Sequence, residues 1–161
     1  MSVQSLRRIF LSYDYRRDAH RAVAVRAAWI AQGGVVHLET AKANSKSDIA
    51  RWIDREIADA SVTVVLVGSH TRHSKWVEYE IRQSELTGKG LIGVDVSGIR
   101  DQFGDRSTCD GELPIGYPFY NWIADNGERN LTQWVDQAVR SCGRLAGAVT
   151  SNDKVEEVIA L

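Results

Sequence analysis

The chain has 161 residues, of which 43% are hydrophobic and 25% charged, and its formal net charge is −1 at pH 7. A chain of this length fits one domain that buries about two-thirds of its unfolded surface, so a second full domain is not expected. The near-neutral charge provides no electrostatic attraction to nucleic acid, and no apolar stretch approaches the ~20 residues that cross a bilayer. Without cysteine pairs at metal-ligand spacing or an apolar run typical of a signal peptide, we expect a cytoplasmic protein.

Strand and helix patterns alternate along the first hundred residues. The predicted strands cover residues 7–13, 35–38, 62–67 and 91–96. The predicted helices follow caps at Asp18, at Ser45 or Ser47, and at Ser74, and extend to about residues 32, 60 and 87. Right-handed crossovers then give a flavodoxin-like α/β fold, a doubly wound parallel sheet with strand order 2-1-3-4 and room for a fifth strand at its edge.

Glycine and proline interrupt the periodicity in residues 97–129. The aromatic run at 117–123 is expected to pack as a short strand or a flap beside the ligand edge, although filling the core under a long loop is an equal alternative. A last helix follows a cap at Asn130 and ends at Gly143. We therefore expect one domain over residues 1–148, in which 97–129 form a long aromatic insertion, and a C-terminal tail at 149–161.

Two glutamates lie on the helix that follows the central strand, and they differ in their neighbours. Glu78 has Arg82 four residues later, which is sufficient to explain it as an exposed ion pair. Glu80 has no cation at helical spacing and shares a face with Trp76. A carboxylate beside a tryptophan, at the carboxyl edge of a sheet, is a candidate for a perturbed pKa and a functional role. An ordinary solvated glutamate is the alternative.

The sequence lacks the motifs of several classes of nucleotide-binding and phosphoacceptor proteins. The sequence contains neither a GxxxxGK[ST] phosphate loop nor a GxGxxG after the first strand. A receiver domain would use Asp14, but it also needs an aspartate at the end of the central strand, where this chain has Val67-Gly68-Ser69. His70 and His73 have no carboxylate partner at ligand spacing, so we expect no metal site.

Two segments carry a resemblance to a known family. Arg8-Ile9-Phe10-Leu11-Ser12-Tyr13 resembles the first strand of TIR domains. The run Ser74-Lys75-Trp76-Val77-Glu78-Tyr79-Glu80-Ile81 resembles their serine-x-tryptophan motif with its glutamate. With the strand and turn at 62–69 and the segment 88–94, the chain is most similar to the TIR-like branch that includes the sensor proteins of bacterial Thoeris antiphage systems.

The resemblance implies an enzyme that cleaves NAD at the nicotinamide ribosyl bond, with NAD as substrate and no further cofactor. Glu80 matches the glutamate that engages the ribose in enzymatic TIR domains. Trp76 would wall the pocket. The remaining candidates for substrate contact are Ser12, Tyr13, Asp14 and Ser69, for which structural roles in turns and core are an even alternative.

The same resemblance implies partners and leaves alternatives open. In Thoeris systems the cyclised or conjugated ADP-ribosyl product activates a separate effector protein. The loop at 39–46 lacks the proline and glycine common in TIR domains, so homo-oligomerisation is left open. A non-catalytic interaction module is the main alternative, with Arg16, Arg17, Arg21 and Trp29 as its partner surface. A nucleoside glycosyltransferase is a third.

Overall fold

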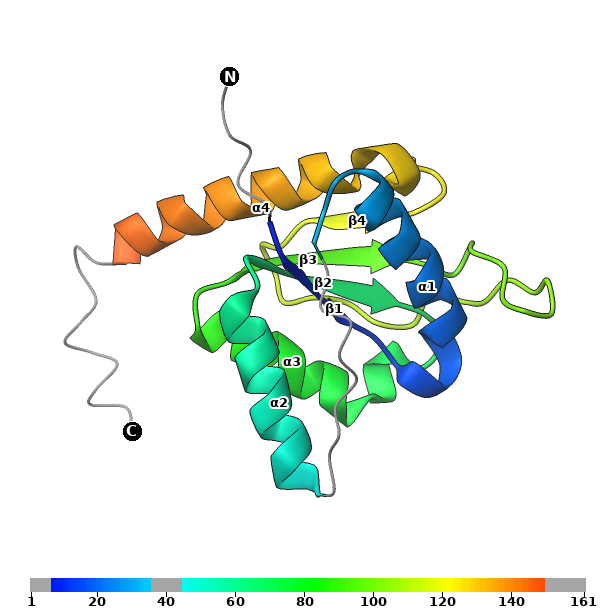
Figure 1. Ribbon diagram of the computed structural model, residues 1–161, viewed down its shortest axis with the longest axis horizontal. Helices are drawn as coiled ribbons and strands as arrows, with labels where there is room; N and C mark the ends of the chain where they lie inside the picture. The colour runs from blue at the N-terminus through cyan, green and yellow to red at the C-terminus, as the bar shows by residue number, and fades with distance from the viewer. Residues whose placement is uncertain (1–6, 36–44, 150–161) are drawn as a thin grey trace.

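The computed structural model describes residues 7–35 and 45–149, with side chains up to residue 142. Within these ranges two helices in succession precede the second strand, and two strands in succession precede the last helix (Figure 1). The strands are β1 (Ile9–Ser12), β2 (Val62–Val67), β3 (Gly90–Asp95) and β4 (Phe119–Asn121). The α-helices are α1 (Tyr15–Ala31), α2 (Lys46–Asp59), α3 (Lys75–Leu86) and α4 (Gly127–Val149), and a short 3-10 helix, η1 (Thr71–His73), precedes α3. None of the described helices is long and apolar enough to cross a membrane.

The described strands form one parallel sheet in the order β1-β2-β3-β4. β2 is buried along its whole length, as its unbroken apolar run predicts for a central strand. It pairs with both neighbours, so that Val65 lies beside Ser12 of β1 and Val67 beside Asp95 of β3. Because all the strands are parallel, their carboxyl ends meet at one edge of the sheet. The predicted parallel α/β architecture is confirmed.

The predicted strand order is only partly tested. Val35, the first residue of the expected second strand, makes a parallel bridge to Arg8, but residues 36–44 lie outside the described part of the chain. The order 2-1-3-4 is therefore not confirmed. The aromatic run does form the predicted short strand, because β4 pairs in parallel with β3 at the edge of the sheet. Most of the loop at 39–46 and of the tail also lies outside the described residues.

Helices cover both faces of the sheet (Figure 1). On one face, Val62, Val64 and Leu66 of β2 pack in a cluster with residues of α1 and α4. On the other face, Val65 and Val67 pack against Val77 of α3. Each such buried aliphatic side chain contributes about 1.5–3 kcal/mol. Apolar side chains of β2 thus point alternately to the two faces of the sheet, where they pack against the helices on each side. This packing holds the strand ends in place.

Ser45 and Ser74 cap α2 and α3 as predicted, since their hydroxyls accept hydrogen bonds from the amides of Asp48 and Val77. The predicted cap at Asp18 is wrong. α1 begins earlier, and Asp14 is its cap, because the Asp14 carboxylate accepts the Arg16 amide at 3.0 Å. Asp18 instead lies one turn inside the helix and is fully buried.

The predicted bounds of the last helix are also wrong. α4 begins at Gly127 rather than after Asn130, and it continues past Gly143 to Val149. A Cβ at Gly127 would lie 2.1 Å from the Trp122 ring, so the helix can begin beside this buried indole only with a glycine.

Candidate active site

Glu80 lies on the buried side of α3. Its exposed fraction is 8%, whereas the Glu78 side chain is 68% exposed and pairs with Arg82 at 3.2 Å. The helix is held against β2 by Ser84, whose hydroxyl is 2.6 Å from that of Thr63 and donates to the Glu80 carbonyl at 2.7 Å. The capped start of α3 and this contact fix the height at which the Glu80 carboxyl meets the sheet.

The Glu80 carboxyl accepts a hydrogen bond from the hydroxyl of Ser12, the last residue of β1. Ser12 is fully buried and points to the face of the sheet that α2 and α3 cover. Both residues were candidates from the sequence, and the structure brings them together across 68 positions of the chain. The carboxyl therefore lies at the carboxyl edge of the sheet, where ligands bind in open α/β folds.

Burial raises the pKa of Glu80 to about 8, and the hydrogen bond from Ser12 offsets only part of this effect. No cation among the described residues pairs with this carboxyl, in contrast to Glu78. At neutral pH the buried group thus holds a proton in the absence of a positively charged ligand. A cationic ligand beside it would favour the ionised form.

Tyr13 and Asp14 follow Ser12 at the same edge. Burial is the main cause that raises the pKa of Tyr13, while Arg26 lowers it and the charge of Glu80 raises it further. The Tyr13 ring also stacks on Tyr15, with ring centroids 6.3 Å apart. Tyr13 therefore lies within electrostatic reach of Glu80, whereas Asp14 serves the start of α1 as its cap. Sequence reasoning missed Tyr15, which is 74% exposed beside this site.

Trp76 is half-buried one turn before Glu80. Its ring meets Tyr79 edge to face, with centroids 5.8 Å apart, and both pack against a cluster that contains Phe10 and Ile57. The Tyr79 hydroxyl donates to Asp54 of α2 at 2.6 Å. An apolar wall between α2 and α3 thus adjoins the helix face that carries Glu80.

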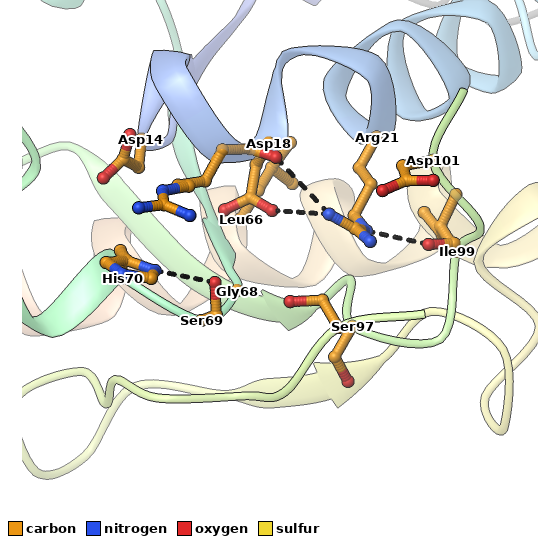
Figure 2. Close-up of polar contacts among 12 residues, drawn as sticks. Asp14, Asp18, Arg21, Leu66, Gly68, Ser69, His70, Ser97, Ile99 and Asp101 are labelled. Atoms are coloured by element: carbon orange, nitrogen blue, oxygen red, sulfur yellow. Dashed lines mark hydrogen bonds and ion pairs between the residues drawn. The ribbon is translucent and has the colours of Figure 1, made fainter. Parts of the chain in front are cut away.

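A second polar group occupies the same edge on the α1 side of the sheet (Figure 2). Ser69, the remaining sequence candidate, is hydrogen-bonded to the ring of its neighbour His70 at 2.8 Å. Asp18 pairs with Arg21, with 3.2 Å between Oδ1 and Nη1. Burial raises the pKa of Asp18, and Arg21 opposes this effect. The structure therefore separates Ser69 from the Ser12 and Glu80 pair and groups it with His70.

The expected partner surface of the alternative function is partly buried. Arg21 is 4% exposed and Trp29 is 2% exposed, so neither is available to a partner. Arg21 instead donates to the carbonyls of Ile99 and Asp105, at 2.7 and 3.1 Å. The Asp18 and Arg21 pair could have been noticed as oppositely charged residues three apart on one helix, but its burial has no signal in the sequence.

Comparison with known proteins agrees with this fold. Residues 10–101 match the family model described as "Thoeris protein ThsB, TIR-like domain", a range that includes both Ser12 and Glu80. The chain belongs to this family, which confirms the resemblance found in the sequence. It is 31% identical over 137 residues to a protein of Bacillus cereus (strain MSX-D12) named "Putative cyclic ADP-D-ribose synthase ThsB1"; the match covers 80% of this chain and 71% of that protein.

Proposed function

We propose that this protein cleaves NAD at the bond between nicotinamide and ribose and converts the ADP-ribosyl part into a cyclic or conjugated nucleotide signal in antiphage defence. The observation that carries the proposal is the buried Glu80 carboxyl, held by Ser12 at the carboxyl edge of the sheet. The family match and the name of the Bacillus relative support the same chemistry.

The reaction needs a negative charge at the place where positive charge develops. When the bond breaks, its electron pair goes to the nicotinamide nitrogen, the ring becomes neutral, and the ribose acquires oxocarbenium character. A carboxylate close to that ribose stabilises the developing charge more strongly in a buried site than in water. Glu80 can supply this carboxylate. Burial favours its protonated form, but the positive charge of the nicotinamide ring in bound NAD would favour loss of the Glu80 proton. The Ser12 hydroxyl would keep the carboxylate oriented toward the ribose.

The other candidate residues would contact the substrate or shape the pocket around it. Tyr13 would contact the ribose or nicotinamide, because it follows Ser12 at the end of β1. Trp76 would wall the pocket on the α2 side and exclude water. Asp14 and Ser69 would contact other parts of the substrate from the same edge of the sheet. NAD is the substrate, and no additional cofactor or metal has a role in this mechanism.

The biological setting of the proposal follows from the family. The protein would act in the cytoplasm, and its product would diffuse to a separate effector protein and activate it. A homo-oligomer as the active form is part of the hypothesis, so activity should be sought at high protein concentration.

The test is incubation of purified protein with NAD, followed by separation of nicotinamide and ADP-ribosyl products by chromatography and mass. We expect the wild type to release nicotinamide and Glu80→Gln to lose at least about 100-fold in rate, because removal of one stabilising group costs that much in comparable sites. Glu78→Gln is the matched control on the same helix, and its rate should equal that of the wild type, because its carboxylate is exposed. Equal rates for wild type and Glu80→Gln would refute the assignment.

The product mass then separates hydrolysis from cyclisation or conjugation. If the wild type stays silent, also with lysate of phage-infected cells, the non-catalytic interaction module becomes the better description. In that case Arg16 and Arg17, which are exposed at the start of α1, are the remaining residues of its expected surface.

A further inference from the structure

His70 combines a fixed ring with a free nitrogen at the carboxyl edge of β2. Nδ1 lies 2.8 Å from the Ser69 hydroxyl, and Nε2 has no hydrogen bond or ion pair to any part of the chain that the structure describes. The ring is half-buried. His73, three residues later, differs in both respects, because it is 73% exposed and its Nε2 lies 3.9 Å from Asp110. Of the two histidines, only His70 has a ring nitrogen within hydrogen-bond distance of a partner, and this contact leaves Nε2 open to accept a proton.

Asp18 supplies a negative charge beside the turn that carries His70. Its Oδ1 pairs with Arg21, but Oδ2 is buried without a hydrogen-bond partner in the described structure. Oδ2 lies directly against Gly68, since a Cβ there would be 2.3 Å from it. Figure 2 shows Arg21 on one side of the Asp18 carboxylate and His70 on the other. The charges of Asp18 and His70 interact, because a protonated His70 lowers the pKa of Asp18.

The sheet places this group at the same edge as the proposed site of bond cleavage. Ser12, which holds Glu80, pairs with Val65 of the adjacent strand, and β2 ends at Val67, just before Gly68 and His70. Glu80 approaches this edge from the α3 side and Asp18 from the α1 side. Glu80 and the group of Asp18 and His70 therefore lie at one edge of the sheet and approach it from its two faces.

We propose that His70 accepts the proton of the hydroxyl group that attacks the ribosyl carbon after nicotinamide has left. The proposal rests on the function proposed above. The C–N bond to nicotinamide breaks, the new C–O bond forms from the attacking hydroxyl, and its proton moves to Nε2 of His70 and then to solvent. The attacking hydroxyl belongs to water in hydrolysis and to the substrate itself in cyclisation, and both release one proton.

Ser69 and Asp18 are positioning residues in this mechanism. When Nδ1–H donates to the Ser69 hydroxyl, the lone pair of the ring is on Nε2, where it can accept a proton. Asp18 places a negative charge against Gly68, two residues before His70, through a carboxylate oxygen that has no hydrogen-bond partner in the described structure. The Glu80 carboxylate is then free to face the ribosyl cation.

The experiment compares His70→Gln and His73→Gln with the wild type in the NAD assay. We expect His70→Gln to lower kcat about 100-fold or more, the range for removal of a general base, while KM for NAD changes by less than about threefold. His73→Gln should match the wild type in both constants. The urea midpoint of unfolding of His70→Gln should match that of the wild type, since the ring is half-exposed.

Chemical rescue separates a proton acceptor from a structural residue. In His70→Ala, added imidazole should restore a large part of the lost kcat. A buffer of equal ionic strength that contains no imidazole should not restore it. The product mass tells whether the rescued reaction uses water or a hydroxyl of the substrate. Equal kcat for His70→Gln and His73→Gln, or no rescue by imidazole, would overturn the role of His70 while nicotinamide release by the wild type still supports the proposed function. A wild type that releases no nicotinamide overturns both.

Discussion

At the scale of single residues, the main feature of the molecule is a carboxyl group in a place that suits its neutral form. Glu80 is 8% exposed, and the Ser12 hydroxyl is its hydrogen-bond partner in the described structure. A structural ion pair would lower the pKa of a glutamate, whereas burial raises this one to about 8. The ionised form that the proposed reaction needs is thus unfavourable for the folded protein without substrate.

This conflict predicts how stability depends on pH. The folded state holds the Glu80 proton up to about pH 8, while an unfolded glutamate releases it near its ordinary pKa of 4.5. The contribution of the protonated group to folding is therefore complete below pH 4.5 and is lost as the pH rises toward 8. Glu80→Gln cannot ionise, so its stability relative to wild type should increase over this window, by about 2–5 kcal/mol at pH 8.5.

Urea denaturation of both proteins at pH 5, 7 and 8.5 measures this difference. Glu78→Gln is the control and should follow the wild type at every pH, because Glu78 is exposed. A constant difference between Glu80→Gln and wild type across the three pH values would show that Glu80 is not buried in its neutral form.

At the scale of elements, the sequence predicted those features that depend on neighbouring residues in the chain, such as buried strands and helix caps. The unbroken apolar run at 62–67 forms the central strand, and Ser74 caps α3, both as predicted. The prediction of a cap at Asp18 is wrong because Asp14 caps α1, and only tertiary packing places Asp18 against Gly68. The sequence indicates that Glu80 has no local cation, but its contact with Ser12 joins two elements far apart in the chain and has no local signal.

The edge strand β4 depends on a glycine in its neighbour. A Cβ at Gly93 of β3 would lie 2.5 Å from the Phe119 ring and 3.0 Å from Leu113, so both side chains pack in the space that this glycine leaves. Gly93→Ala should destabilise the protein by about 1–3 kcal/mol through overpacking. Hydrogen exchange should show faster exchange in β4 and around Leu113, while β1 and β2 serve as the internal control. Uniformly faster exchange in all strands would contradict a local role for Gly93.

At the scale of the whole molecule, one buried arginine ties distant parts of the chain together. Arg21 on α1 pairs with Asp18 and donates to the carbonyls of Ile99 and Asp105, in the segment between β3 and β4. These contacts hold part of that long segment against α1. They were invisible in the sequence, where Arg21 resembles any exposed helical arginine, because hydrogen bonds to backbone carbonyls leave no pattern in residue type.

The pair of Asp18 and Arg21 gives a prediction in the form of a double-mutant cycle. Arg21→Met keeps the aliphatic bulk of the side chain but leaves Asp18 as a buried carboxylate without its cation, so it should cost about 3–5 kcal/mol of stability. Asp18→Asn in the same background removes that uncompensated charge and retains the shape that fits against Gly68. The double variant should therefore be more stable than Arg21→Met alone, although each single change destabilises the wild type.

Urea denaturation of the four proteins at pH 7 measures the coupling free energy, which we expect to be at least about 1 kcal/mol for groups in direct contact. The exposed pair of Glu78 and Arg82 is the matched control, and its cycle should give about 0.5 kcal/mol or less. Additive effects of Asp18→Asn and Arg21→Met would mean that the two groups do not stabilise one another. The contacts of Arg21 with the carbonyls of Ile99 and Asp105 would then not depend on Asp18.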